Sequence, residues 1–318
     1  MKNKFKEKNS TFLYDNELDL KEMFNIVWAK KLFVTSLSSI IASLAIIYSL
    51  NLPNIYTSES LLAPASAEDS MSSKLGSLSS FASIGGLSLS NDSTYKSLEA
   101  IERINSFDFF STYFLPNVKL ENIIAVKEWV PKDNILIYDQ DIFDSKSNKW
   151  VREVSYPMQT IPSEQEAFEV YKEIMSITQD NKSTFVTLSI DHKSPLIAKK
   201  WVEIIIFQIN DSMQKFDAKK SEKSIAFLNK KSLTTNIQSL RDATVNLLEN
   251  QMQILMLTSS SDYYVFKVIN SPLAPEKKSS PRRALICIIG GLVGIFISIL
   301  IVIIQHYRKS EDFSSKND

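Results

Sequence analysis

Two long apolar runs, one near each end of the chain, dominate the pattern of hydrophobic and polar positions. After Lys31 no charged residue occurs before Glu59, and the apolar part of that gap covers residues 32–52. The second run, residues 284–305, is also free of charged side chains. Each run matches the roughly 20 residues that a helix needs to cross about 30 Å of hydrocarbon. We therefore predict two transmembrane helices, over residues 32–52 and 284–305.

Two other interpretations of such runs are open. Either run could be a buried core helix of a soluble protein, and the first could be a cleaved signal peptide. The first run begins after 31 residues, which is longer than an ordinary n-region, and small-x-small triplets occur only around residues 63–67. We therefore interpret the first run as an uncleaved transmembrane helix.

The charges around the runs predict an orientation. Lysines precede the first run, and no Lys or Arg follows it until Lys74. The positive-inside rule then gives a cytoplasmic N-terminal segment (1–31), a periplasmic domain (53–283) and a cytoplasmic tail (306–318). Four cations on the outer flank of the second run oppose this rule, but long loops are translocated largely regardless of charge. We expect a two-pass protein of the bacterial inner membrane.

Between the spans, the pattern predicts an α+β base domain formed by residues 53–194 and 262–283. Ser163 and Glu166 form a capping box at the start of a helix that we expect to reach about Gln179. A second helix is predicted over residues 97–110. Runs rich in β-branched and aromatic residues predict strands over 56–62, 135–138, 150–154, 185–190 and 263–269.

From Ser194 onward the pattern predicts one very long helix that projects from the base. Ser194 is a good N-cap, Pro195 suits the first helical position, and neither Gly nor Pro recurs before Pro272. A helix over residues 195–258 would be about 95 Å long at 1.5 Å per residue. A bend is possible at residues 211–224, where apolar residues become sparse.

The second half of this helix carries a repeat with alternating spacings of four and three. The positions are Leu233, Ile237, Leu240, Thr244, Leu247, Gln251 and Ile254. This is an a/d seam with two polar interruptions. A lone helix cannot bury it, so we expect packing against other copies or another long helix.

The composition of the chain excludes several classes of partner and functional site. Lys+Arg and Asp+Glu are both 36, so no net charge points to nucleic acid. Cys287 is the sole cysteine, which excludes a disulfide framework, and only His192 and His306 are available as imidazole ligands. His192, between Asp191 and Lys193, is interpreted as an exposed loop residue. With no paired carboxylates, triad or metal cluster, we predict no enzyme activity, no metal and no cofactor.

The segment around the start of the second span supplies the candidate interaction residues. Three prolines keep its backbone extended. Its cations fit a plain interfacial anchor, and the alternative is a contact with a phosphate-bearing lipid or glycan. The GxxxG glycines could contact a neighbouring copy, the first span or a polymerase. The full set is Pro272, Pro275, Lys277, Lys278, Pro281, Arg282, Arg283, Gly290, Gly291 and Gly294.

Five segments resemble the Wzz-type polysaccharide co-polymerases, the bacterial polysaccharide chain-length determinants. They are DLKEMFNIVWAKK before the first span, YTSESLLAP after it, the SLSSFASIGGLSL loop, SPLIAKKWVEIIIFQIN, and residues 248–285, where a Tyr/Phe-rich strand precedes the prolines and the second span. The resemblance implies a periplasmic base, a long projecting helix and ring-like homo-oligomers.

The same resemblance implies regulation of O-antigen chain length by a scaffold that acts on a membrane polymerase, with a lipid-linked glycan as a possible contact. Relatives with a cytoplasmic tyrosine kinase carry a P-loop, and the six glycines here provide no GxxxxGK. The alternative function is therefore an adaptor or export component that works with a separate kinase. A two-pass sensor is a weaker alternative, because no output domain is evident.

Overall fold

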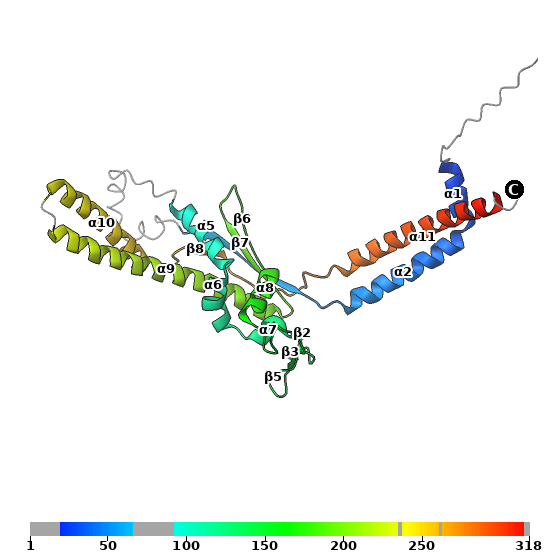
Figure 1. The fold of residues 1–318 in the computed structure, drawn as a ribbon, viewed down its shortest axis with the longest axis horizontal. Helices are drawn as coiled ribbons and strands as arrows, with labels where there is room; N and C mark the ends of the chain where they lie inside the picture. Colours follow the sequence, from blue (N-terminus) through cyan, green and yellow to red (C-terminus); the bar gives the residue numbers. More distant parts are fainter. Residues whose placement is uncertain (1–19, 66–91, 235–236, 261–262, 315–318) are drawn as a thin grey trace, which may run out of the picture. The chain divides into compact units, whose positions relative to one another are not determined.

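The structure is a computed structural model that describes residues 20–65, 92–234, 237–260 and 263–314. The Ser/Gly-rich loop noted in the sequence lies outside these residues. The chain divides into two compact units, one formed by residues 1–52 and 281–318, the other by residues 53–280. Figure 1 labels the elements of both units.

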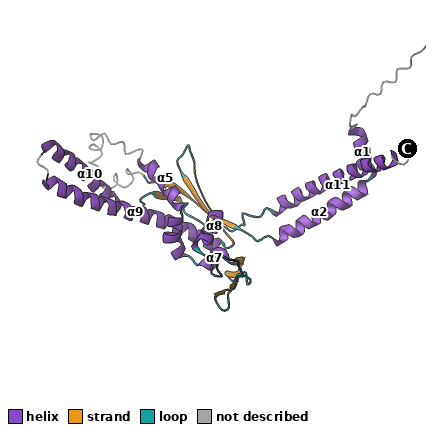
Figure 2. Ribbon diagram, viewed as in Figure 1, coloured by secondary structure: helices purple, strands orange, loops and turns teal. Residues whose placement is uncertain are grey.

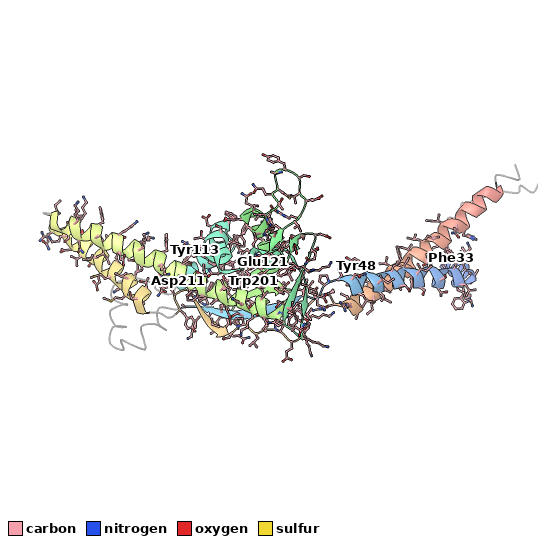
Figure 3. All side chains as sticks on the ribbon, turned by 90° about the horizontal axis from the view of Figure 1, so that it is seen from below. Phe33, Tyr48, Tyr113, Glu121, Trp201 and Asp211 are labelled. Carbon is pink, nitrogen blue, oxygen red and sulfur yellow. The ribbon has the colours of Figure 1, made fainter. Side chains whose placement is uncertain are left out.

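The first unit is helical. It contains α1 (Leu20–Ala29), α2 (Lys31–Asn51) and α11 (Arg283–Ser314). Helices α2 and α11 pack side by side, and both are long and apolar enough to cross a membrane. Most of their large apolar side chains are exposed, as Figure 3 shows for Phe33 and Tyr48 on α2. A soluble core helix would bury such residues, so the exposure favours a lipid environment.

The second unit is built around a four-stranded antiparallel sheet of order β6-β7-β1-β8. Its strands are β1 (Tyr56–Pro64), β6 (Met175–Gln179), β7 (Val186–His192) and β8 (Phe266–Asn270). In β7, every second side chain is buried, which is the period expected when one face of a sheet meets a core. Helix α9 (Pro195–Thr234) packs against β1 and β7.

Short elements complete the base, and Figure 2 shows the mixture of helices and strands. The helical elements are α5 (Asp92–Ile104), α6 (Phe107–Phe109), the π-helical turn η1 (Phe110–Phe114), the 3₁₀ turn η2 (Leu115–Asn117), α7 (Leu120–Ile124) and α8 (Glu164–Ile174). Two small ribbons pair β2 (Val126–Val130) with β3 (Ile135–Tyr138) and β4 (Phe143–Asp144) with β5 (Lys149–Trp150).

Aromatic side chains form the centre of the core. Phe114 lies 4.9 Å from Tyr171 and 5.6 Å from Trp201 between ring centroids. The Tyr171 hydroxyl donates to the Ile104 carbonyl at 3.1 Å, which satisfies the one polar atom of that buried ring. Figure 3 places Trp201 on α9 within the base.

The predicted α+β class with a span near each end is confirmed. The predicted capping box is also present, since the Ser163 hydroxyl accepts from the Glu166 N–H and the Glu166 carboxylate accepts from the Ser163 N–H. Helix α8 ends at Ile174, however, rather than near Gln179, because residues 175–179 pair with β7 as β6.

The long helix exists but differs from the prediction in length and course. Helix α9 covers 40 residues and is unbroken through 211–224, where a bend was considered possible, and it ends at Thr234 rather than at residue 258. Helix α10 (Gln238–Ser260) then packs antiparallel against it, with the Gln214 side-chain amide donating to the Thr258 carbonyl. The chain thus provides its own second long helix, which was one of the two expected partners for the seam.

Candidate functional site

Two of the three predicted prolines and both predicted lysines lie in residues 271–280, which we call the return segment, and Pro281 follows it directly. The return segment follows β8 and runs back along β1. Beyond the Leu61–Asn270 pair the regular ladder stops. Pro272 is buried, and neither it nor Pro275 has an N–H to donate to the ladder.

Hydroxyl groups of β1 replace the lost ladder bonds. The Ser58 hydroxyl donates to the Leu273 carbonyl at 2.8 Å, and the Ser60 hydroxyl donates to the Asn270 carbonyl at 2.7 Å. Both serines are fully buried, so these bonds form away from water and fix the path of the segment. Neither serine was among the predicted site residues, although their two-residue spacing in YTSESLL places both on the inward face with Leu62.

The end of the return segment is fastened to the start of the unit by a group that we call the clasp, formed by Ile55, Ser279 and Ser280. The Ile55 N–H donates to the Ser280 carbonyl at 2.9 Å, and the Ser279 N–H donates to the Ile55 carbonyl at 2.9 Å. The Ser279 hydroxyl also donates to the Ile55 carbonyl at 3.0 Å. The beginning of this unit, at Ile55, and its end, at Ser280, are therefore neighbours.

The four predicted cations belong to different units and have different surroundings. In the second unit, Lys277 is exposed, while the Lys278 ammonium donates to the Asn54 side-chain oxygen at 3.1 Å. In the first unit, Arg282 is exposed, while the Arg283 guanidinium donates to the Leu52 carbonyl at 3.4 Å. A cation next to the last carbonyls of α2 suits the negative end of that helix.

Small residues line the contact between α2 and α11. A Cβ added to Gly290 would lie 2.4 Å from the Ala45 Cβ, and one added to Gly294 would lie 3.2 Å from the Ile41 Cβ. Gly291 has no such neighbour within 4 Å. Of the three contacts weighed for the GxxxG motif, Gly290 and Gly294 make the one with the first span, and Gly291 faces open space.

The buried residues of α11 continue this face. Ser298 and Val302 are fully buried and follow Gly294 at steps of four residues. The Ser298 hydroxyl donates to the Gly294 carbonyl at 2.5 Å, so this polar group is satisfied within its own helix. The close approach of α2 and α11 therefore rests on one row of the helix.

His192 is buried rather than exposed, contrary to the sequence interpretation. It is 7% exposed at the end of β7, and its ring lies 4.9 Å from that of Trp201. Nδ1 accepts from the Ser194 N–H at 2.9 Å and Nε2 lies 3.0 Å from the Asn122 carbonyl, which fits a neutral ring with its proton on Nε2. Burial lowers the pKa of His192, and the neighbouring Lys193 charge acts in the same direction.

Another polar residue that the sequence did not reveal is Asn210, in the middle of α9. Its side-chain oxygen accepts from the N–H groups of Tyr264, Val265 and Phe266 at 3.1, 2.8 and 3.0 Å. Its amide group donates to the Ile206 and Phe266 carbonyls at 2.9 and 3.2 Å. One buried side chain therefore fixes the start of β8 on the long helix.

Within the described part of the chain, no group of three or more His, Cys, Asp or Glu residues is arranged to hold a metal ion. The arrangement offers packing surfaces and exposed cations, which suit contacts with membranes or other proteins.

Comparisons with known proteins give one informative match. The family model "Wzz: Chain length determinant protein" matches residues 16–114. No curated protein matches the chain. A solved "full-length bacterial polysaccharide co-polymerase" aligns with a TM-score of 0.41 and 14% identity, over 92% of this chain and 99% of that one.

A second solved structure is a "Fragment of WzzB, Polysaccharide Co-polymerase from Salmonella Typhimurium". It aligns with a TM-score of 0.32 and 12% identity, over 71% of this chain and all of the fragment. The family match covers α1, α2, β1 and α5 together with the turns that follow. The sequence resemblance is thereby confirmed for this part of the protein: residues 16–114 are similar to the Wzz chain length determinant family.

Proposed function

We propose that this protein regulates the chain length of a bacterial surface polysaccharide, the O-antigen of lipopolysaccharide. The observation that carries the proposal is the Wzz family match over residues 16–114. Two apolar helices that bracket an α+β unit support it, since such a protein can hold a folded domain at one membrane surface. The protein acts as a scaffold rather than an enzyme.

In this proposal the protein sits in the inner membrane with both termini in the cytoplasm and residues 53–280 in the periplasm. The lysines before the first span support this orientation. Copies of the chain form a homo-oligomer that contacts a membrane O-antigen polymerase or its lipid-linked glycan. Lys277 and Arg282, two of the three exposed cations of the predicted set, are the residues that we assign to that contact, together with Gly291 on the open side of α11.

The test is deletion of the gene followed by gel analysis of the lipopolysaccharide. If the protein is a regulator, the deletion strain should still make polymer but without its modal length. Expression of the intact chain in that strain should restore the modal length. An unchanged ladder contradicts the proposal. Complete loss of polymer would instead favour the adaptor or export function.

A second test addresses the assigned residues. Lys277→Glu with Arg282→Glu should shift the modal length while the protein remains at its normal level in the membrane. Lys267→Glu, an exposed lysine of β8, is the control and should leave the ladder unchanged. Equal effects of the two variants would remove these cations from the proposed contact.

A further inference from the structure

The β2–β3 ribbon exposes a face that carries two isoleucines beside Glu128, and no described part of the chain covers it. Ile135 and Ile137, both on β3, are 55% and 41% exposed. In an antiparallel pair, directly opposed residues share a face, so the Val130–Ile135 and Glu128–Ile137 pairs define the outer face. A two-stranded ribbon is marginally stable in isolation, and exposed isoleucines do not stabilise it in water.

The opposite face of the ribbon holds it on the base. Trp129 and Leu136 are paired there, and the Trp129 ring meets the Tyr56 ring edge-on at 5.5 Å. At the start of the ribbon, the Lys193 ammonium donates to the Val126 carbonyl. At its end, the Tyr138 hydroxyl donates to the Asn122 side-chain oxygen at 2.7 Å. The outer isoleucines are thus presented by a fixed element rather than by a loose loop.

The covalent chain limits how far this ribbon can be from a bilayer. Tyr56, its contact on β1, follows Asn51, the last residue of α2, by five residues. A chain of that length reaches at most about 18 Å at ~3.6 Å per residue. The preceding residue, Ile55, is bridged to Ser280, which lies three residues before Arg283, the first residue of α11. Both spans therefore tether the contact residue of the ribbon near the membrane surface.

The composition of the ribbon fits that location. The exposed charges of the ribbon, Lys127, Glu128, Lys132 and Asp133, balance to zero, so apolar contact rather than attraction to anionic lipid is the stabilising term.

We propose that the β2–β3 ribbon is an interfacial membrane anchor, in which Ile135 and Ile137 enter the boundary between headgroups and acyl chains of the bilayer that α2 and α11 cross. The anchor fixes the base domain to the membrane at a third place besides the two spans. It requires only that α2 and α11 span the bilayer, so it does not depend on which glycan the protein regulates.

The experiment uses the full chain in phospholipid nanodiscs, with Cys287→Ala to remove the native thiol. An environment-sensitive fluorophore is attached at Ile137→Cys, and quenching by lipids with a spin label near the headgroup is compared with quenching by lipids labelled deep in the acyl chain. Ile237→Cys is the matched control, because Ile237 is also an exposed isoleucine, 63% exposed, beyond the far end of the 40-residue helix α9. Leu44→Cys on α2 sets the signal for a lipid-facing residue.

We expect blue-shifted emission at position 137 and quenching by the headgroup label at least about twofold stronger than at position 237, with weaker quenching by the deep label. If quenching at 137 equals that at 237, the anchor does not exist. A blue shift without lipid quenching also overturns the proposal, because protein rather than lipid would then cover the ribbon. Lys132→Cys, at the exposed turn of the ribbon, keeps both isoleucines and gives the same readout if the Ile137 variant does not fold.

Discussion

At the scale of single residues, two buried polar side chains hold the base domain together. Asn210 satisfies three consecutive N–H groups at the start of β8, and His192 links the end of β7 to α7. Each has its hydrogen bonds in a dry environment, where an unsatisfied group is costly. Replacing either should therefore have effects far larger than an exposed substitution.

Asn210→Leu should destabilise the protein strongly. Leucine has a similar size but leaves three buried N–H groups without their acceptor, and each such group costs about 1–3 kcal/mol. We expect a loss of at least about 2 kcal/mol, measured as a shift in the denaturant midpoint of the full chain in detergent. Asn229→Leu, exposed on the same helix, should change the midpoint little, and equal losses would contradict the role given to Asn210.

His192 should make stability depend on pH. Burial lowers its pKa from the ordinary 6.5, so below that pH the unfolded chain binds a proton that the folded chain does not. The free energy of unfolding should therefore fall as the pH decreases below about 6.5. Above that pH the folded and unfolded chains both hold a neutral His192, and this residue causes no further change.

The variant for this measurement is His192→Gln, whose amide can donate to the Asn122 carbonyl but does not titrate. Its unfolding free energy should be flatter than that of the parent chain between about pH 7.5 and 5.5, whatever its absolute value. Parallel curves for the two proteins would assign the pH dependence to other groups.

The buried positions of His192 and Asn210 were not predicted from the sequence, for different reasons. Val186, Leu188 and Ile190 alternate clearly, and His192 is the next position in the same alternation, but its charged neighbours suggested a loop. The alternation therefore indicated a buried His192, but the charged residues on either side of it led to the prediction of an exposed loop. Asn210 gave no such signal, since its role depends on backbone groups that lie more than 50 residues further along the chain.

At the scale of elements, strong local signals predicted well and tertiary pairing did not. The spans, the Ser163 capping box and the strand over residues 135–138 follow from apolar length, cap chemistry and β-branched composition. Strand β6 was missed because Met175–Gln179 continues a helical pattern and becomes a strand only by pairing with β7. The end of α9 at Thr234 was missed because no Gly or Pro marks it.

The packing of α2 and α11 should depend on which glycine is replaced. Gly290→Ile places side-chain atoms against Ala45 and should force the helices apart, at a cost of about 1–3 kcal/mol. Gly291→Ile is the matched control, because its side chain enters open space.

The readout is crosslinking between cysteines at positions 30 and 305, whose native side chains are joined by a 3.1 Å hydrogen bond. In a chain with Cys287→Ala, a short bis-maleimide should link them efficiently in the parent and the Gly291 variant, and poorly in the Gly290 variant. Equal yields in both glycine variants would show that the close approach at Gly290 does not hold the pair.

At the scale of the whole molecule, the hairpin of α9 and α10 buries only part of the predicted seam. Thr244 is buried, whereas Leu240 and Leu247 remain 53% exposed each. The two leucines therefore offer an apolar face to another copy of the chain, in line with the proposed homo-oligomer.

Leu240→Glu combined with Leu247→Glu should lower the mass of the detergent-solubilised particle, measured by light scattering. Charges on an apolar interface are costly, whereas the same charges on an exposed polar position are tolerated. Asn246→Glu with Gln253→Glu, both exposed on α10, is the control and should keep the parental mass. If the leucine variant also keeps it, assembly does not use this face.

The clasp determines how the second unit, residues 53–280, would respond to a mechanical load. Force that separates the two spans would act on Pro53 and Pro281, and it would reach Ile55 and Ser280 at the same end of two antiparallel segments. Hydrogen bonds between two segments that are pulled apart from the same end break one after another. When two strands are pulled from opposite ends, all of their hydrogen bonds carry the force together. The hydrogen bonds of the clasp should therefore break at a lower force than the rest of the domain. Their rupture would lengthen both connections to the spans and leave the core around Trp201 intact.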